Sequence, residues 1–144
     1  MIGRMRSRSL TWSTAQDVEF LGELGEDDKP AFYAGAAATL FPSDWPEPFG
    51  LVMIESLAAG TPVIALRRGS VPEVLVHEQN GYICDDTEAV IEAVARLDDI
   101  DPAACRRRAD DFNVSTMCTR YQRAYETLQR TRSSTAPGFS LRLA

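Results

Sequence analysis

The sequence predicts an α/β fold, built on a short parallel sheet with helices flanking it. Two apolar runs, Thr39–Phe41 and Val63–Leu66, have the length and composition of buried strands. Between them Leu51, Ile54 and Leu57 recur at the spacing of one helix face. A strand followed by a helix and a second strand is the unit from which parallel sheets are built, so this one stretch indicates the fold class.

Proline and glycine set the boundaries within this stretch. The prolines between residues 42 and 48 cannot continue a strand, because the proline ring fixes φ and removes the amide donor. They therefore place a loop before the helix. Gly60 and Pro62 follow the helical pattern, where glycine caps a helix and proline prevents its continuation. We accordingly expect strand, loop, helix, turn and strand in succession.

The remaining elements are assigned from periodicity, capping residues and turn residues. In chain order we expect a strand at Asp17–Leu21, a helix at Glu26–Ala37, a helix at Val71–Val76 capped by Ser70, a strand at Tyr82–Cys84 after the Asn80-Gly81 turn, a helix from Asp86 or Thr87 to about Leu97, a helix from Asp101 to about Phe112, and a last helix capped by Ser115. In the last helix one stripe predicts a face packed on the domain: Met117, Tyr121, Ala124, Tyr125 and Leu128.

Length and composition limit the classes of protein. The chain has 144 residues, enough for one domain, and 44% of them are hydrophobic. Its net charge of −6 argues against a nucleic-acid partner, because such a partner requires a basic face. No apolar run approaches the ~20 residues of a membrane span. Cys84, Cys105 and Cys118 lack metal-ligand spacing and are typical of free thiols in a reducing compartment, so we expect a cytoplasmic protein without a metal site.

The two ends of the chain differ in composition from its middle. Residues 1–14 are rich in arginine, serine and threonine, and residues 131–144 contain mainly serine, threonine, proline and other small or polar residues. We expect a disordered leader at 1–14 and a disordered tail at 131–144. One domain then spans residues 15–130.

Two carboxylates accompany the central helix. Glu47 lies in the loop before it and Glu55 lies in its second turn. The amides of Phe49, Gly50 and Leu51 are at the helix start, where they lack intrahelical acceptors and suit an anion such as phosphate. Ionised glutamate accepts hydrogen bonds from hydroxyl groups, so phosphate flanked by sugar hydroxyls indicates a nucleotide sugar. The alternative is that Glu47 is a stabilising helix-start charge and Glu55 lies on a solvated face.

The run PSDWPEPFGLVMIESLAAGTPVIALRRGSVPEV resembles the donor-binding region of retaining glycosyltransferases of family 4, also called group 1. Their signature of two glutamates with seven residues between them is matched by Glu47 and Glu55. A Gly-Thr-Pro-Val turn follows at Gly60, and a Gly-x-x-x-Glu loop follows at Gly69. The resemblance covers roughly residues 18–128. It implies the GT-B architecture of two Rossmann-like domains, of which this chain is a truncated C-terminal part.

The resemblance also implies roles for individual residues. Glu55 corresponds to the residue that holds the ribose hydroxyls, and Glu47 to the catalytic residue that orients a hydroxyl of the donor sugar. The amides of Phe49, Gly50 and Leu51 correspond to those that stabilise the sugar and the departing diphosphate. Gly22 and Glu23 would border the base. The implied donor is a UDP-, GDP- or ADP-hexose, the implied acceptor a glycan or lipid, as in polysaccharide biosynthesis, and no metal or other cofactor is implied.

The chain matches only part of such an enzyme. Relative to the family it lacks the acceptor domain, two strands of the donor domain and the basic pair that grips the donor diphosphate. In the common strand order 3-2-1-4-5-6, the strand at Asp17–Leu21 would not neighbour the strand at Leu40, whose edge is left open. We therefore expect a donor-binding piece that is incomplete alone. The alternative is a non-catalytic remnant, or a partner-binding piece that pairs with an acceptor-domain chain or self-associates through the open edge.

Overall fold

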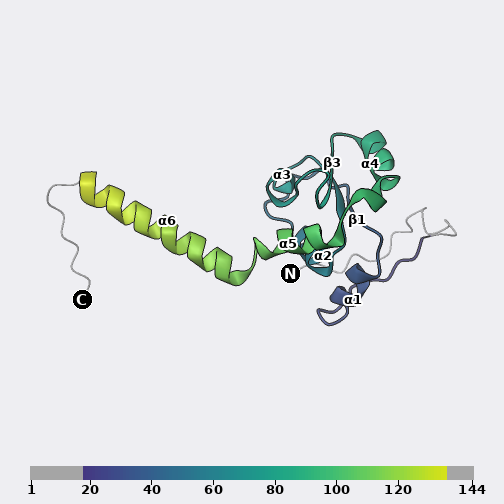
Figure 1. Cartoon of the computed structure of the whole chain (residues 1–144), viewed down its shortest axis with the longest axis horizontal. Helices are drawn as coiled ribbons and strands as arrows, with labels where there is room; N and C mark the ends of the chain where they lie inside the picture. Colours follow the sequence, from purple (N-terminus) through teal and green to yellow (C-terminus); the bar gives the residue numbers. More distant parts are fainter. Residues whose placement is uncertain (1–17, 136–144) are drawn as a thin grey trace.

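The computed structural model describes residues 18–135, and they form an α/β domain from which one long helix projects (Figure 1). Three parallel strands make the sheet, in the order β1 (Thr39–Phe41), β2 (Val63–Leu66) and β3 (Gly81–Cys84). This confirms the predicted α/β class and the two strands of the central stretch. Within the described residues β1 has β2 as its one strand neighbour, so its other edge is open, as expected.

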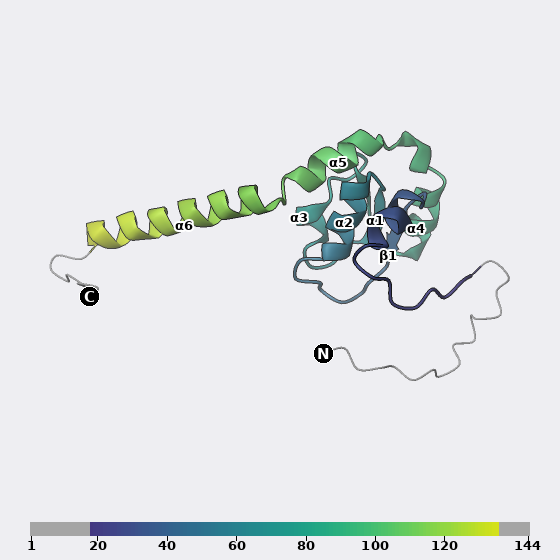
Figure 2. The ribbon, with the colours of Figure 1, turned by 90° about the horizontal axis from the view of Figure 1, so that it is seen from below.

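Helices connect and flank these strands. Their bounds are α1 (Lys29–Ala34), α2 (Leu51–Ala59), α3 (Val71–Val74), α4 (Thr87–Val94), the 3₁₀ turn η1 (Leu97–Asp99), α5 (Pro102–Asp110) and α6 (Val114–Thr135). Helix α2 packs on β1 and β2, α4 packs on β2 and β3, and α1 and α5 both pack on α2. Figure 2 shows α1 and α5 next to α2. The carboxylate-bearing helix is therefore the element that joins most of the domain.

The core lies between α2 and the sheet. Met53 and Leu57 of α2 have no solvent exposure, and Val63 and Ala65 of β2 are likewise fully buried. Tyr82 of β3 is buried and its hydroxyl donates to the carbonyl of Arg96 at 2.7 Å. Burying a side chain of this size contributes about 1.5–3 kcal/mol, so the packing fixes the face that α2 turns inward.

A buried polar network closes the turn after α2. Gly60 caps the helix at φ +90° and donates to the carbonyl of Leu57, a conformation that glycine adopts without strain. Thr61 Oγ1 donates to the carbonyl of Tyr33 at 2.7 Å, and Ser56 Oγ donates to the carbonyl of Thr61 at 3.0 Å. Ser56 Oγ is also 2.8 Å from Thr39 Oγ1. These bonds tie α1, β1 and α2 together.

The N-terminal part of the described chain differs from the prediction. Residues 18–21 form no strand, and Asp17 lies outside the described residues. Phe20 is 91% exposed, and no strand of the described sheet pairs with this segment to supply hydrogen bonds. Helix α1 is shorter than the predicted Glu26–Ala37, because residues 26–28 form a turn before it and Gly35 ends it.

Two helix caps also differ. Ser70 makes no cap hydrogen bond at α3, which ends at Val74. The last helix begins at Val114, and Asn113 rather than Ser115 caps it, accepting from the amide of Thr116 at 2.8 Å. Asparagine is as good an N-cap as serine, and it immediately precedes the first helical residue. At α4 the structure selects Asp86, whose side chain accepts from the amide of Ala89.

The last helix contradicts the predicted packing. Figure 1 shows α6 extending away from the domain, and its apolar stripe is exposed, Tyr121 by 58% and Leu128 by 61%. The stripe lies on one helix, as its spacing predicts, but no residue of the described chain covers it. The helix also continues to Thr135, into the segment expected to be a disordered tail. The rest of that tail and the expected leader lie outside the described residues.

Candidate functional site

The loop that carries Glu47 is fixed against the loop after β2. Gly69 has φ +50°, and a β-carbon there would lie 2.6 Å from the amide nitrogen of Glu47 and nearer still to its carbonyl oxygen. The amide of Ser70 donates to this carbonyl at 2.9 Å. Arg68 Nε donates to Asp44 Oδ1 at 2.9 Å beside it. The glycine of the Gly-x-x-x-Glu loop is therefore required for close approach of the two backbones.

Glu47 covers the start of α2 with its own side chain. Its Oε1 accepts from the amide of Gly50 at 3.2 Å and lies 3.5 Å from the amide of Phe49. Gly50 precedes the helix in the left-handed conformation, at φ +75°. A carboxylate at a helix start is stabilising, so this geometry satisfies the structural alternative for Glu47 as well as the functional one. Two of the three amides expected to bind an anion are thus already engaged.

The third amide belongs to Leu51, the first residue of α2. The amides of Leu51 and Val52 belong to the first turn, where a helix offers no acceptors of its own. Leu51 is 63% exposed and Val52 is 39% exposed, so a ligand can approach the helix start from solvent. An anion that reaches all the predicted amides must first displace the carboxylate of Glu47.

Glu55 projects from α2 toward α1 rather than into bulk solvent. Tyr33 Oη donates to Glu55 Oε2 at 3.1 Å, and Lys29 Nζ lies 3.6 Å from Glu55 Oε1. The side chain of Glu55 is 32% exposed. Burial, together with the hydrogen bond to Glu55, raises the pKa of Tyr33, so its hydroxyl remains a donor at neutral pH. The solvated-face alternative for Glu55 therefore does not describe this structure.

Lys29 is shared between two carboxylates. Its Nζ lies 2.6 Å from Glu26 Oε1, a shorter contact than the one to Glu55. The hydrogen bond with Glu26 raises the pKa of Lys29 against the opposing effect of burial, and the carboxylate of Glu55 adds a smaller increase. Lys29 and Tyr33 are four residues apart and so share one face of α1. Neither contact with Glu55 could be predicted from the sequence, because no local pattern pairs that face of α1 with Glu55.

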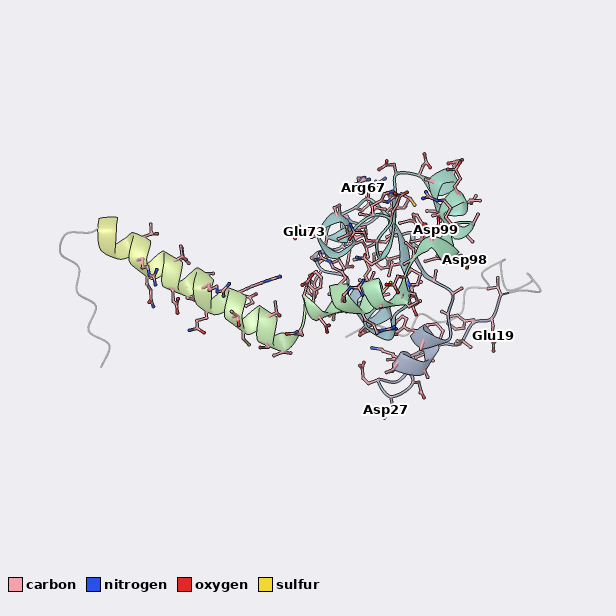
Figure 3. The ribbon with its side chains drawn as sticks, viewed as in Figure 1. Glu19, Asp27, Arg67, Glu73, Asp98 and Asp99 are labelled. Atoms are coloured by element: carbon pink, nitrogen blue, oxygen red, sulfur yellow. The ribbon has the colours of Figure 1, made fainter. Side chains whose placement is uncertain are left out.

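The residues expected to border the base lie just before α1. Gly22 lines a surface hollow of about 400 Å³, together with Leu21, Leu24, Lys29 and Tyr33. Glu23, the other expected residue, does not line it. Lys29 and Tyr33 line this hollow and also contact Glu55, which does not itself line it. Figure 3 shows Glu19, which also lines the hollow, far from Arg67 and Glu73 on the α3 side of the domain.

Phe49 joins the start of α2 to the end of α5. Its ring lies edge-on to the ring of Phe112, with centroids 6.2 Å apart. The guanidinium of Arg108 in turn stacks on the ring of Phe112, 4.9 Å from its centroid. Arg108 Nε also donates to the carbonyl of Val74 at 2.8 Å, which links α5 to α3. The α2 start is thus supported from two neighbouring helices.

Between residues 18 and 135 no cluster of three or more histidine, cysteine or acidic side chains is arranged to hold a metal ion. No helix in the same part of the chain has the length and apolar character needed to cross a membrane.

Comparison with known proteins assigns the class. The family model of glycosyl transferases group 1 matches residues 4–109, which include both glutamates and the Gly69 loop. The chain therefore belongs to the group 1 glycosyltransferase family. The match begins at residue 4 and ends at residue 109, whereas the resemblance was expected to cover roughly residues 18–128. The match ends before α6.

Particular relatives match most of this chain. The glycogen synthase of Mycobacterium tuberculosis is 35% identical over 121 residues, and the match covers 77% of this chain and 29% of the relative. Among solved structures, sucrose-phosphate synthase from Thermosynechococcus elongatus has a TM-score of 0.66 at 29% identity, over 84% of this chain and 32% of that one. Anabaena HepE in complex with UDP-glucose has a TM-score of 0.56 at 27% identity, over 72% and 30%. The chain thus spans about a third of each relative.

Proposed function

We propose that this chain binds the nucleotide-sugar donor of a retaining hexosyl transfer and forms part of the donor side of a glycosyltransferase site. The observation that carries the proposal is the placement of Glu47 in the loop just before α2 and of Glu55 in the second turn of that helix. Glu47 lies on the amides of the helix start, and Glu55 contacts Lys29 and Tyr33, which line the hollow at Gly22. Membership of the chain in the group 1 glycosyltransferase family supports this assignment.

The proposed roles follow from the chemistry of each group. Glu55 accepts hydrogen bonds from the ribose hydroxyls, since an ionised carboxylate only accepts. The amides of Phe49, Gly50 and Leu51 stabilise the sugar and the diphosphate, on which negative charge grows as it departs. For this the carboxylate of Glu47 leaves the amides that it now contacts and orients a hydroxyl of the donor sugar. The base lies near Gly22.

The donor is proposed to be a nucleoside diphosphate hexose, of UDP, GDP or ADP type. A structural neighbour, Anabaena HepE, was solved in complex with UDP-glucose, which supports this class of donor. The proposed acceptor is a glycan or lipid, held by residues outside this chain. We expect transfer to require those residues, because holding donor and acceptor in one geometry lowers a barrier by as much as ~7–11 kcal/mol.

An activity assay tests this function. The purified chain is incubated with UDP-, GDP- and ADP-hexoses, with and without candidate acceptors, and release of nucleoside diphosphate is measured. The chain alone should give no turnover. Joined to an acceptor domain and the first part of a donor domain, it should give acceptor-dependent turnover. There Glu47→Gln should lower kcat more than it weakens donor affinity, since its role is orientation.

Glu92→Gln on α4 is the matched control, because Glu92 is exposed and lies on a different helix. It should leave kcat unchanged. Acceptor-dependent turnover by the chain alone, abolished by Glu47→Ala, would show that the chain is a complete enzyme. Equal kcat in the Glu47→Gln and Glu92→Gln enzymes would remove Glu47 from the catalytic role.

A second candidate function is association through the open edge of β1, with a second copy or with a separate acceptor-domain chain. The observation that favours it is the exposure of Leu40, at 55%, on a strand with one described neighbour. An unpaired edge of this kind is a template for pairing with another strand. Sedimentation of the chain across a concentration series tests self-association, and Leu40→Lys should suppress it.

A further inference from the structure

Helix α1 holds the carboxylate of Glu55 at two points. Tyr33 donates to one oxygen, Oε2, at 3.1 Å, and Lys29 lies 3.6 Å from the other, Oε1. Two different donors on the two oxygens fix both the position of the carboxylate and the orientation of its plane. We infer that Tyr33, assisted by Lys29, is a positioning residue for the ribose contact of Glu55. This inference rests on the proposed function.

Tyr33 is suited to this task because it is itself immobile. It is the buried residue of α1, with 7% exposure. Its carbonyl accepts a buried hydrogen bond from Thr61 Oγ1 at 2.7 Å, which fastens its backbone to the turn that ends α2. The phenol ring has few rotatable bonds, so its hydroxyl occupies a defined position relative to α2. A fixed donor of this kind restricts the rotamers of the flexible glutamate.

Lys29 contributes less than Tyr33. Its ammonium group lies closer to Glu26 than to Glu55, at 2.6 Å against 3.6 Å, and its side chain is 29% exposed. The carboxylate of Glu26 is 85% exposed, so this ion pair is open to screening by salt. The side chains of Lys29 and Glu55 are also partly exposed, so their ion pair should weaken as salt rises more than the hydrogen bond from the neutral Tyr33 does.

Glu55 retains free acceptor capacity. An ionised carboxylate has about four lone-pair positions, and Tyr33 and Lys29 occupy two of them. With 32% of its side chain exposed, the remaining positions are open to a ligand. Ribose offers two adjacent hydroxyls, at its 2′ and 3′ carbons. Two donors on neighbouring carbons require a carboxylate of fixed orientation, which is what the contacts from α1 supply.

The test compares ribose with its deoxy analogues. Binding of UDP, GDP and ADP, and of the corresponding 2′-deoxy and 2′,3′-dideoxy nucleoside diphosphates, is titrated into the full chain by NMR. The variants are Tyr33→Phe, Glu55→Gln and both together. Tyr121→Phe is the matched control, because it removes a tyrosine hydroxyl from the exposed stripe of α6.

The wild-type chain should prefer the ribonucleotide that it binds over its dideoxy analogue by about fivefold or more, the factor for one hydrogen bond of ordinary strength. Glu55→Gln should remove the preference. Tyr33→Phe should reduce the preference for the ribonucleotide over its dideoxy analogue. It should leave the affinity for the dideoxy analogue within about twofold of wild type, since that ligand does not use Glu55. The double variant should lose no more than Glu55→Gln alone, because both changes act on one contact.

A purely structural role for Tyr33 would give a different result. Tyr33→Phe would then weaken the ribonucleotide and the dideoxy analogue by the same factor, or neither, and either outcome overturns the inference. A preference that depends on Glu55 but not on Tyr33 would leave the proposed function standing while the inference fails.

A second measurement needs no nucleotide, and it distinguishes failure of the proposed function from failure of the inference about Tyr33. The carboxylate of Glu55 contributes to the raised pKa of Tyr33, so Glu55→Gln should lower that pKa, measured from the pH dependence of the Tyr33 ring resonances. If the pKa falls but no nucleotide binds, the contact is supported and the proposed function fails. If the pKa is unchanged, the inference is overturned whatever the ligand data show.

Discussion

Gly69 should be highly sensitive to substitution, because it brings two loops into contact. Gly69→Ala places a β-carbon 2.6 Å from the Glu47 amide nitrogen and 2.7 Å from the carbonyl carbon of Pro46. Both are backbone atoms, so the loop that carries Glu47 must move. The amide of Ser70 then loses its bond to the Glu47 carbonyl. A stability change at this position therefore reports on the position of a proposed catalytic residue.

The magnitude follows from two separate costs. A residue other than glycine in the left-handed region costs about 1–2 kcal/mol, and Gly69 has φ +50°. Inserting a methyl group into packed structure costs a further 1–3 kcal/mol, approximately. Gly69→Ala should therefore lower the free energy of unfolding by about 2–5 kcal/mol, a large share of the stability of a small domain.

Two other glycines separate these costs. Gly22 has φ +76° but nothing within 4 Å of an added β-carbon, so Gly22→Ala tests the backbone cost alone. At Gly25 the nearest atom is a side-chain oxygen of Asp28 at 3.6 Å, which is ordinary contact, so Gly25→Ala should change stability by less than about 0.5 kcal/mol. Urea unfolding followed by far-UV circular dichroism gives the three values. A Gly69→Ala chain as stable as Gly25→Ala would refute the close approach of the two loops.

The remaining predictions concern thiols and a helix cap. Burial raises the pKa of Cys105 to about 11 and also raises the pKa of Cys84, whereas Cys118 is exposed on α6. Iodoacetamide at pH 8 should therefore alkylate Cys118 alone in the native chain and all three thiols in urea, as mass spectrometry would show; native alkylation of Cys105 would contradict its burial. Asp86→Ala removes the acceptor of the Ala89 amide and should cost about 0.5–2 kcal/mol in urea unfolding, against no loss for Asp86→Asn.

The part of the fold that could be predicted from sequence is the part set by local signals. The strands at residues 39–41 and 63–66 and the helix between them follow from apolar period, and Gly60 ends that helix as glycine does elsewhere. Residues 18–21 carry a strand-like pattern, but a strand exists only with a neighbour to pair with, and the described chain supplies none there. The apolar stripe of α6 is a second case in which a local pattern does not determine the tertiary contact. Helical spacing identifies one face of the helix but not what covers that face.

The candidate site divides in the same way. The positions of Glu47 and Glu55 relative to α2 could be read from sequence, because both lie within one turn or two of the helix start. The contact of Glu47 with the helix-start amides, and the contact of Glu55 with Tyr33, could not. The second joins residues 22 positions apart through the packing of α1 on α2, which no local pattern encodes.

The central claim is that the start of α2 and Glu55 form the donor side of a glycosyltransferase site. Its most direct test is an amide-resolved NMR titration of the chain with UDP, GDP and ADP. Saturable changes in amide chemical shift are expected at Phe49, Gly50, Leu51 and Glu55 for at least one nucleotide, and these changes should be lost in the Glu55→Gln chain. Saturable shifts confined to other elements such as α4 or α6, or no shift with any nucleotide at millimolar concentration, would contradict it.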